Sequence, residues 1–187
     1  MYSILKESSK YLLGEIYYYL IKKYHEQGNR ALIYHAFGSE LKHDTYGISI
    51  DIKKFNQHME YVTDNYEITH INNVGSSEIN ISITIDDGYK DTLNAVDVLT
   101  KKNIPFTLYI SPGNLDKTDY LSSKDVKDIS LLNECIIGTH GYSHRKLSTL
   151  DKIQQKAELQ KSKIVLEDLI GKEINTLSYP HGSFNQQ

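Results

Sequence analysis

Residues 79–85 alternate strictly between isoleucine and a small polar residue, and this pattern constrains the fold more than any other in the chain. A period of two with β-branched residues indicates a β-strand. The alternation stops at Asp86-Asp87-Gly88, where the glycine permits a tight turn, and helical spacing follows over residues 89–102. A strand, an acidic turn and a helix form a unit that is typical of α/β folds.

The remaining chain continues this alternation of strands and helices. Further strands are expected at residues 31–35, 105–110, 134–138 and 174–178, all parallel to the first. Further helices are expected at residues 51–65, 123–132 and 148–171. Ser123 and a Ser148-x-x-Asp151 capping box are expected to begin the last two of these helices, and Gly171 to end the final one.

Composition narrows the class of protein. A chain of 187 residues can bury the core of one domain, and its net charge of −3 without a basic stripe argues against a nucleic-acid partner. The single Cys135 lies in an apolar run and is expected in the core.

The N-terminal region is expected to be helical. Residues 2–27 have the pattern of an amphipathic helix that packs on the domain, with contact to a membrane surface as the alternative. Because no signal peptide or transmembrane segment is seen, a cytoplasmic location is expected. The sequence does not indicate an oligomeric state.

Ligand-type side chains follow two of the expected strands. Asp86 and Asp87 follow one, and His140 and His144, four residues apart, follow another. In α/β folds the chemistry gathers at the carboxyl ends of the strands. Two imidazoles and one carboxylate with an open position suit a catalytic zinc site, and they also suit a non-haem iron oxygenase. The second aspartate favours hydrolysis, because a hydrolase needs a base to activate water. Each group also has a simpler reading, as a helix-capping turn or as structural histidines.

A third segment favours one family. In order and spacing, residues 84–88, His-x-x-x-His at 140–144 and Tyr-Pro-His-Gly at 179–182 resemble the motifs of the polysaccharide deacetylases, the NodB-homology or family-four carbohydrate esterases. Residues 31–35 and 104–110 are similar to two strands of the same family.

The resemblance implies an incomplete, distorted (β/α) barrel of the NodB type with mostly parallel strands. This domain would span residues 31–187, after an N-terminal helical extension over residues 1–30. It also implies hydrolysis of N-acetyl groups on the amino sugars of a polysaccharide or oligosaccharide, with an N-acetylated glycan as partner.

The resemblance further implies roles for seven side chains and one divalent metal ion, with Zn²⁺ expected. These are Asp86 as catalytic base, Asp87, His140 and His144 as metal ligands, and Tyr179, Pro180 and His181 as substrate contacts. The backbone N–H of His181 would stabilise the oxyanion. His35 ends the first strand, and two roles are left open for it, one in the substrate groove and one that is purely structural.

The family's later motifs, an Asp/Trp segment and a Leu-x-His that supplies a general acid, are not found before Gln187. The expectation is therefore a sheet left open by the early C-terminus and weak activity, with His181 as a substitute proton donor. The alternative is a weak or inactive glycan-binding relative that retains the metal site.

Overall fold

A computed structural model describes residues 28–41, 47–73 and 79–185. Five strands form one sheet in which each paired strand runs parallel to its neighbour. The strands are β1 (Gly28–Tyr34), β2 (Glu67–Ile68), β3 (Ile79–Ile85), β4 (Phe106–Ile110) and β5 (Cys135–Thr139). Their order is β1-β3-β4-β5, with β2 pairing to the start of β3 and β4 to its end.

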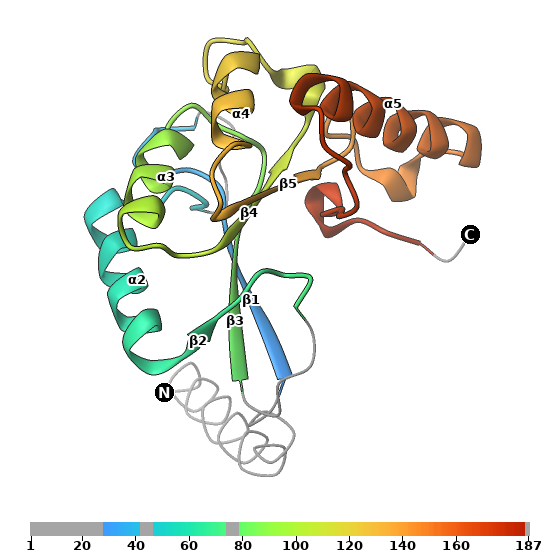
Figure 1. The fold of residues 1–187 in the computed structure, drawn as a ribbon. Coiled ribbons are helices and arrows are strands. Elements are labelled where there is room, and N and C mark those ends of the chain that lie inside the picture. Colours follow the sequence, from blue (N-terminus) through green and yellow to red (C-terminus); the bar gives the residue numbers. More distant parts are fainter. Residues whose placement is uncertain (1–27, 42–46, 74–78, 186–187) are drawn as a thin grey trace, which may run out of the picture.

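Within the described residues, four α-helices and three short 3₁₀ turns connect and cover these strands. They are α2 (Ile52–Asn65), α3 (Thr92–Lys101), α4 (Ser123–Ile129), α5 (Lys152–Ile170), η1 (Pro112–Asn114), η2 (Leu147–Thr149) and η3 (Pro180–Gly182). Figure 1 shows α2 and α3 side by side along the sheet, whereas α5 lies beside β5 together with the segment that follows it.

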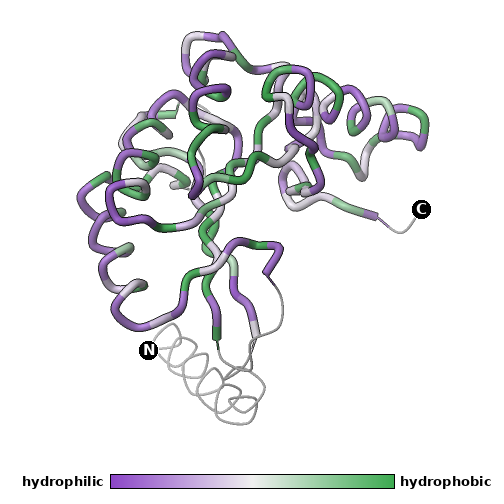
Figure 2. The backbone as a smooth tube through the Cα atoms, in the orientation of Figure 1, coloured by the Kyte–Doolittle hydropathy of each residue, from purple (hydrophilic) through white to green (hydrophobic). Residues whose placement is uncertain are grey.

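The core lies between the sheet and the helices. Phe55 and Met59 of α2 are fully buried, as are Ile85 of β3 and Leu108 of β4. Figure 2 shows the same distribution, with hydrophobic backbone concentrated in the central strands and hydrophilic stretches along the helices. Each such side chain contributes roughly 1.5–3 kcal/mol to folding when it leaves water.

The parallel register brings the carboxyl ends of the strands to one edge of the sheet. Tyr34 of β1 pairs with Ile85 of β3, and Ile110 of β4 pairs with Thr139 of β5. Thr139 also makes an isolated parallel bridge to Leu177. The residues that come directly after these positions, among them Asp86 and His140, therefore meet at one edge.

The predicted fold class is confirmed, since the strands are mostly parallel and the sheet is not closed in the described part of the chain. The predicted helix over residues 2–27 lies outside the described residues, and the boundary at residue 30 stays a prediction. None of the helices that the structure describes combines the length and hydrophobicity needed to cross a membrane.

The predicted strand at residues 174–178 is reduced to one parallel bridge, between Leu177 and Thr139. The pairing does not extend along the segment, because β5 ends at Thr139. Pro180, three residues after Leu177, then turns the chain into η3. Ile174 lies outside any strand, and its side chain is buried in the core. The two-residue strand β2 was not predicted, since two residues carry no periodicity.

Two predicted helix starts are also wrong. Helix α4 is capped by Ser122, with Asp125 completing the capping box, while Ser123 Oγ donates to Asp116 at 2.6 Å. Helix α5 is capped by Asp151 with Gln154 as its partner, and this moves the capping box three residues along the chain. The predicted cap Ser148 lies in η2, where its hydroxyl contacts that of Ser183. Gly171 ends α5 in the left-handed conformation, as predicted.

The close approach of β5 to its neighbours gives a stability prediction. A methyl group at Gly138 would collide with the Tyr109 ring and would lie 2.5 Å from Thr176 Oγ1. Since overpacking a core position costs about 1–3 kcal/mol, Gly138→Ala should lower the free energy of unfolding by this amount in urea denaturation. A change within about 0.5 kcal/mol, typical of a surface substitution, would contradict the packing described for this strand.

Candidate metal and catalytic site

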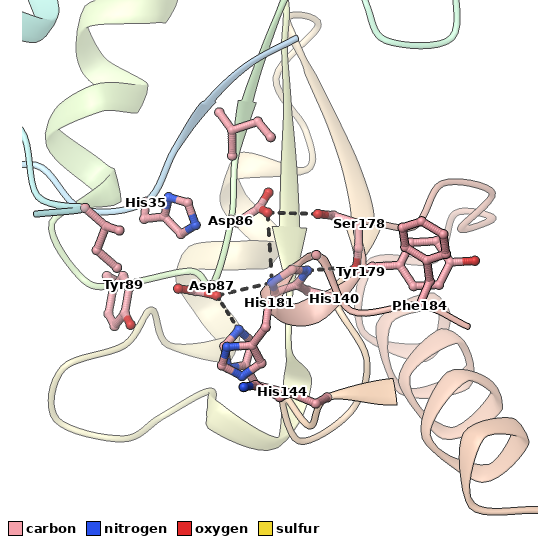
Figure 3. Close-up of a pocket in the computed structure, with 14 residues that line it drawn as sticks. His35, Asp86, Asp87, Tyr89, His140, His144, Ser178, Tyr179, His181 and Phe184 are labelled. Carbon is pink, nitrogen blue, oxygen red and sulfur yellow. Dashed lines mark hydrogen bonds and ion pairs between the residues drawn. The ribbon is translucent and has the colours of Figure 1, made fainter. Parts of the chain in front are cut away.

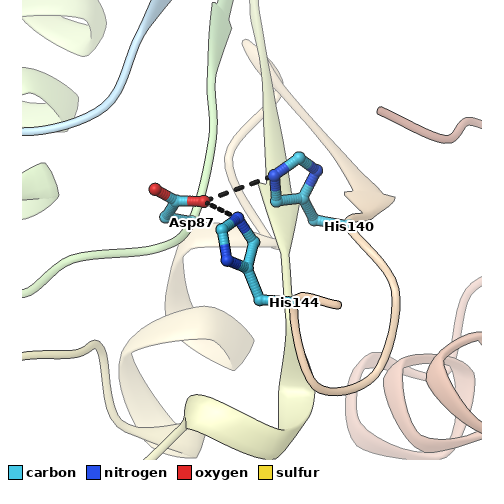
Figure 4. Close-up of side chains that lie close together, drawn as sticks. All are labelled: Asp87, His140 and His144. Carbon is cyan, nitrogen blue, oxygen red and sulfur yellow. Dashed lines mark ion pairs between the residues drawn. The ribbon is translucent and has the colours of Figure 1, made fainter. Parts of the chain in front are cut away.

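Three side chains from two strand ends converge on one point (Figure 4). Asp87 Oδ1 lies 2.9 Å from His144 Nε2 and 3.3 Å from His140 Nε2. One oxygen and two nitrogens offered by these residues all lie within 4.8 Å of one another. The carboxylate and His140 are buried, and His144 is 26 % exposed.

The three side chains are arranged like the ligands of one metal ion. Asp87 Oδ1 is buried and has no hydrogen-bond partner of acceptable geometry among the described residues, although His144 Nε2 is only 2.9 Å away. A buried, unpaired carboxylate oxygen is costly, whereas a cation between the three atoms would satisfy it. Zinc prefers such a set of imidazole nitrogens and carboxylate oxygen. The residues therefore fit a divalent metal ion.

The ring of His140 is oriented by the chain itself. Its Nδ1 lies 2.8 Å from the carbonyl oxygen of Ser178, so the Nδ1–H donates to that carbonyl. In the neutral ring this leaves the lone pair of Nε2 directed at Asp87. Burial opposes protonation of His140, but the nearby Asp87 and Asp86 outweigh it and raise its pKa. A metal ion would compete with that proton for Nε2.

The backbone at the end of β3 explains how Asp87 reaches the histidines. Asp87 and Gly88 both have positive φ, 71° and 74°, so the chain leaves the strand at once. Consecutive residues of an extended strand would point to opposite faces, but the left-handed Asp87 lies on the same pocket as Asp86. Burial favours a raised pKa for Asp87, yet the imidazoles of His140 and His144 hold it well below its usual range.

Asp86 has a different environment. Its Oδ2 accepts a hydrogen bond of 2.8 Å from the hydroxyl of Ser178, while its buried Oδ1 has no partner among the described residues. Oδ2 lies 3.9 Å from His140 Nε2, farther than Asp87 Oδ1 lies from either ring nitrogen. Burial raises the pKa of Asp86, and the neighbouring His140 only partly opposes this. The pKa values of the two aspartates therefore move in opposite directions, a pattern typical of acid–base sites.

The loop that carries both histidines, residues 140–146, is not a helical turn, although a spacing of four residues would suit one. Residues 140–146 contain no helix, and Gly141 and His144 have φ of 69° and 57°. A non-glycine residue in this conformation costs of order 1–3 kcal/mol and persists only where surrounding contacts hold it. The imidazole rings meet because the loop doubles back, with ring centroids 5.0 Å apart.

A pocket of about 690 Å³ opens over these residues (Figure 3). The ring of His181 lies against that of His144, with centroids 4.5 Å apart. Burial, followed by the neighbouring His144, lowers the pKa of His181. Tyr179 and Phe184 form one rim with exposed rings 5.9 Å apart, and His35 lines the pocket beside Asp86.

The structure brings six of the seven predicted site residues to this pocket, and only Pro180 does not line it. Pro180 is buried beneath the turn, close to Gly141. Sequence reasoning missed Ser178, although it lies directly before the Tyr-Pro-His-Gly motif. It also missed Phe184, for which an aromatic residue just after that motif was the available signal.

Comparison with known proteins gives a consistent result. The sequence model of the family described as polysaccharide deacetylase matches residues 73–187. The Bacillus subtilis (strain 168) protein YxkH, whose name places it among the polysaccharide deacetylases, is 27% identical over an alignment of 168 residues, and the match covers 83% of this chain.

Solved structures show the same fold. The Bacillus cereus polysaccharide deacetylase BC0361 is 25% identical with a TM-score of 0.75, and BA0330 from Bacillus anthracis is 27% identical with a TM-score of 0.74. Each comparison covers 86% of this chain and 53% of the other. The chain thus spans little more than half the length of these proteins, and 57% of YxkH.

The convergence of three ligands gives a prediction about metal content. We expect His140→Ala to lose stoichiometric zinc, because it removes a buried ligand, whereas His58→Ala on α2 should keep it. Zinc content after dialysis, measured by atomic emission, checks this. Unchanged zinc in His140→Ala would show that the three residues are not the ligand set.

Proposed function

The chain belongs to the polysaccharide deacetylase family, and we propose that it is a metal-dependent hydrolase that removes N-acetyl groups from amino sugars of a polysaccharide or oligosaccharide. The observation that carries this proposal is the convergence of Asp87, His140 and His144 beside a second buried carboxylate, Asp86. The named relatives, described as polysaccharide deacetylases, support the class of substrate.

Asp87, His140 and His144 would hold the metal ion, with Zn²⁺ as the proposed ion. When bound there, a divalent cation would act as a Lewis acid toward the amide carbonyl and would make water more acidic. The three ligands come from two strand ends and leave one side of the set facing the pocket, where a substrate can approach.

Asp86 is proposed as the general base. Its Oδ2 is fixed by Ser178, and its Oδ1 has no partner among the described residues, which leaves one carboxylate oxygen for a water proton. Water adds to the amide carbon as Asp86 removes its proton, and the C–N bond then breaks. The proton that Asp86 gains balances the one that the leaving amine takes up, and the products are acetate and a free amino sugar.

The turn at residues 179–182 is proposed to contact the sugar and the reacting carbonyl. The backbone N–H of His181 would donate to the oxyanion that develops during water attack. The imidazole of His181 as a proton donor to the amine stays a prediction. The exposed rings of Tyr179 and Phe184 offer flat apolar surfaces for sugar faces at the rim.

The two aspartates give the test of this proposal. Asp86→Asn should keep the metal and lose turnover by about 10²–10⁴-fold, the usual cost of removing a general base. Asp87→Asn should lose both metal and turnover. Acetate release from an N-acetylglucosamine oligomer, measured with zinc content, checks both variants.

Equal loss of zinc in both variants would show that the adjacent carboxylates share ligation. A parent chain that holds zinc and binds the oligomer, yet releases no acetate, would contradict the hydrolase proposal and favour a glycan-binding role.

The aromatic rim gives a separate prediction about substrate binding. Phe184→Ala should raise KM for the oligomer about five-fold, because some 40 Å² of apolar contact is worth about 1 kcal/mol. The effect on KM should exceed that on kcat, and zinc content should not change. Tyr61→Ala, which removes an exposed ring on α2, is the matched control. Equal KM values for Phe184→Ala and the parent would remove Phe184 from the substrate site.

A further inference from the structure

The loop that carries His140 and His144 (residues 140–146, the histidine loop) makes backbone hydrogen bonds to its surroundings at successive positions. The hydroxyl of Ser111 donates to the carbonyl of His140 at 2.7 Å, and Ser162 Oγ donates to that of Gly141 at 3.1 Å. The N–H of Gly113 donates to the carbonyl of Tyr142 at 2.8 Å. The carbonyls that follow the first histidine are therefore anchored, one by α5 and two by the segment after β4.

Two N–H groups of the same loop donate to one carboxylate. Glu158, half-buried on α5, accepts from the N–H of Tyr142 at 3.1 Å and from that of Ser143 at 2.9 Å through Oε2. Its Oε1 accepts from the hydroxyl of Ser143 at 2.7 Å. All three contacts fall on the two residues directly before His144.

Glu158 makes its hydrogen bonds to a part of the loop that lacks regular secondary structure. Residues 141–146 lie in no helix or strand that could bond their N–H groups, and Glu158 bonds those of half-buried Tyr142 and exposed Ser143. Hydrogen bonds from N–H groups to a carboxylate are roughly twice as strong as neutral ones. Gly141 and His144, on either side of the contacts, have left-handed backbones that need external support.

We propose that Glu158 is a positioning residue that sets the place of His144 relative to Asp87 and His140, and thereby the affinity of the site for a metal ion. This inference rests on the proposed metal site. Glu158 is not a ligand itself, since it is absent from the set of converging atoms and both its oxygens bond the loop. A merely structural role would change stability and leave metal affinity as it was.

Two substitutions separate contact from charge. Glu158→Ala removes all three bonds. Glu158→Gln loses the charge but can keep the geometry, because its Oε1 can accept both N–H groups while its Nε2 donates to Ser143 Oγ. Glu173→Gln is the control, because Glu173 follows the end of α5 and its side chain is 76% exposed.

The measurements are the zinc dissociation constant by chelator competition, the visible spectrum of the cobalt-substituted protein and the unfolding free energy without metal. Glu158→Ala should bind zinc about 10–100-fold more weakly and change the cobalt spectrum, as loss of a partner outside the ligand set commonly does. Glu158→Gln should recover most of this loss, and Glu173→Gln should match the parent.

Zinc affinity of Glu158→Ala within about two-fold of the parent would overturn the inference and leave the metal site intact. Equal losses in the alanine and glutamine variants would also overturn it, because charge and not contact would then matter. A parent chain that binds no zinc would overturn the metal site and the inference together. If Glu158→Ala does not fold, Ser143→Ala removes only the Oε1 contact and should weaken zinc binding in the same direction; unchanged affinity there overturns the inference.

Discussion

Parallel pairing in register is the constraint on which the rest of the structure depends. It aligns the ends of β1, β3, β4 and β5, so that residues far apart in the sequence leave the sheet at one edge. Asp86 follows β3 and His140 follows β5, and Ser178 joins them through the single bridge at Leu177. A shift of one residue in any pair would turn the side chains to the opposite face and separate the site.

At this edge two adjacent carboxylates acquire different properties from their surroundings alone. Asp87 turns back through a left-handed backbone and meets two imidazoles, which keep it charged. Asp86 stays at the strand end, where burial dominates and one oxygen is free of partners among the described residues. The proposed division into ligand and base therefore arises from backbone geometry and burial, not from residue type.

The sequence predicted the strands around β3 and the convergence of Asp86, Asp87, His140 and His144, because strict periodicity and motifs at strand ends are local signals. It could not predict the histidine loop, whose path is set by contacts from Ser111 and from α5. Glu158 carries no local signal, since a glutamate on a long polar helix looks like a surface residue. At the start of α5, the hydroxyl of Ser148 contacts Ser183, which is distant in sequence, and the cap is formed locally by Asp151 and Gln154.

Ser178 contributes to the site through two chemically independent groups. Its carbonyl orients His140, and its hydroxyl bonds Asp86. A carbonyl is present whatever the side chain, so the histidine keeps its partner when residue 178 varies. A substitution at position 178 therefore alters the surroundings of the proposed base and leaves the hydrogen bond to His140 in place, so the two halves of the proposed site can be changed independently.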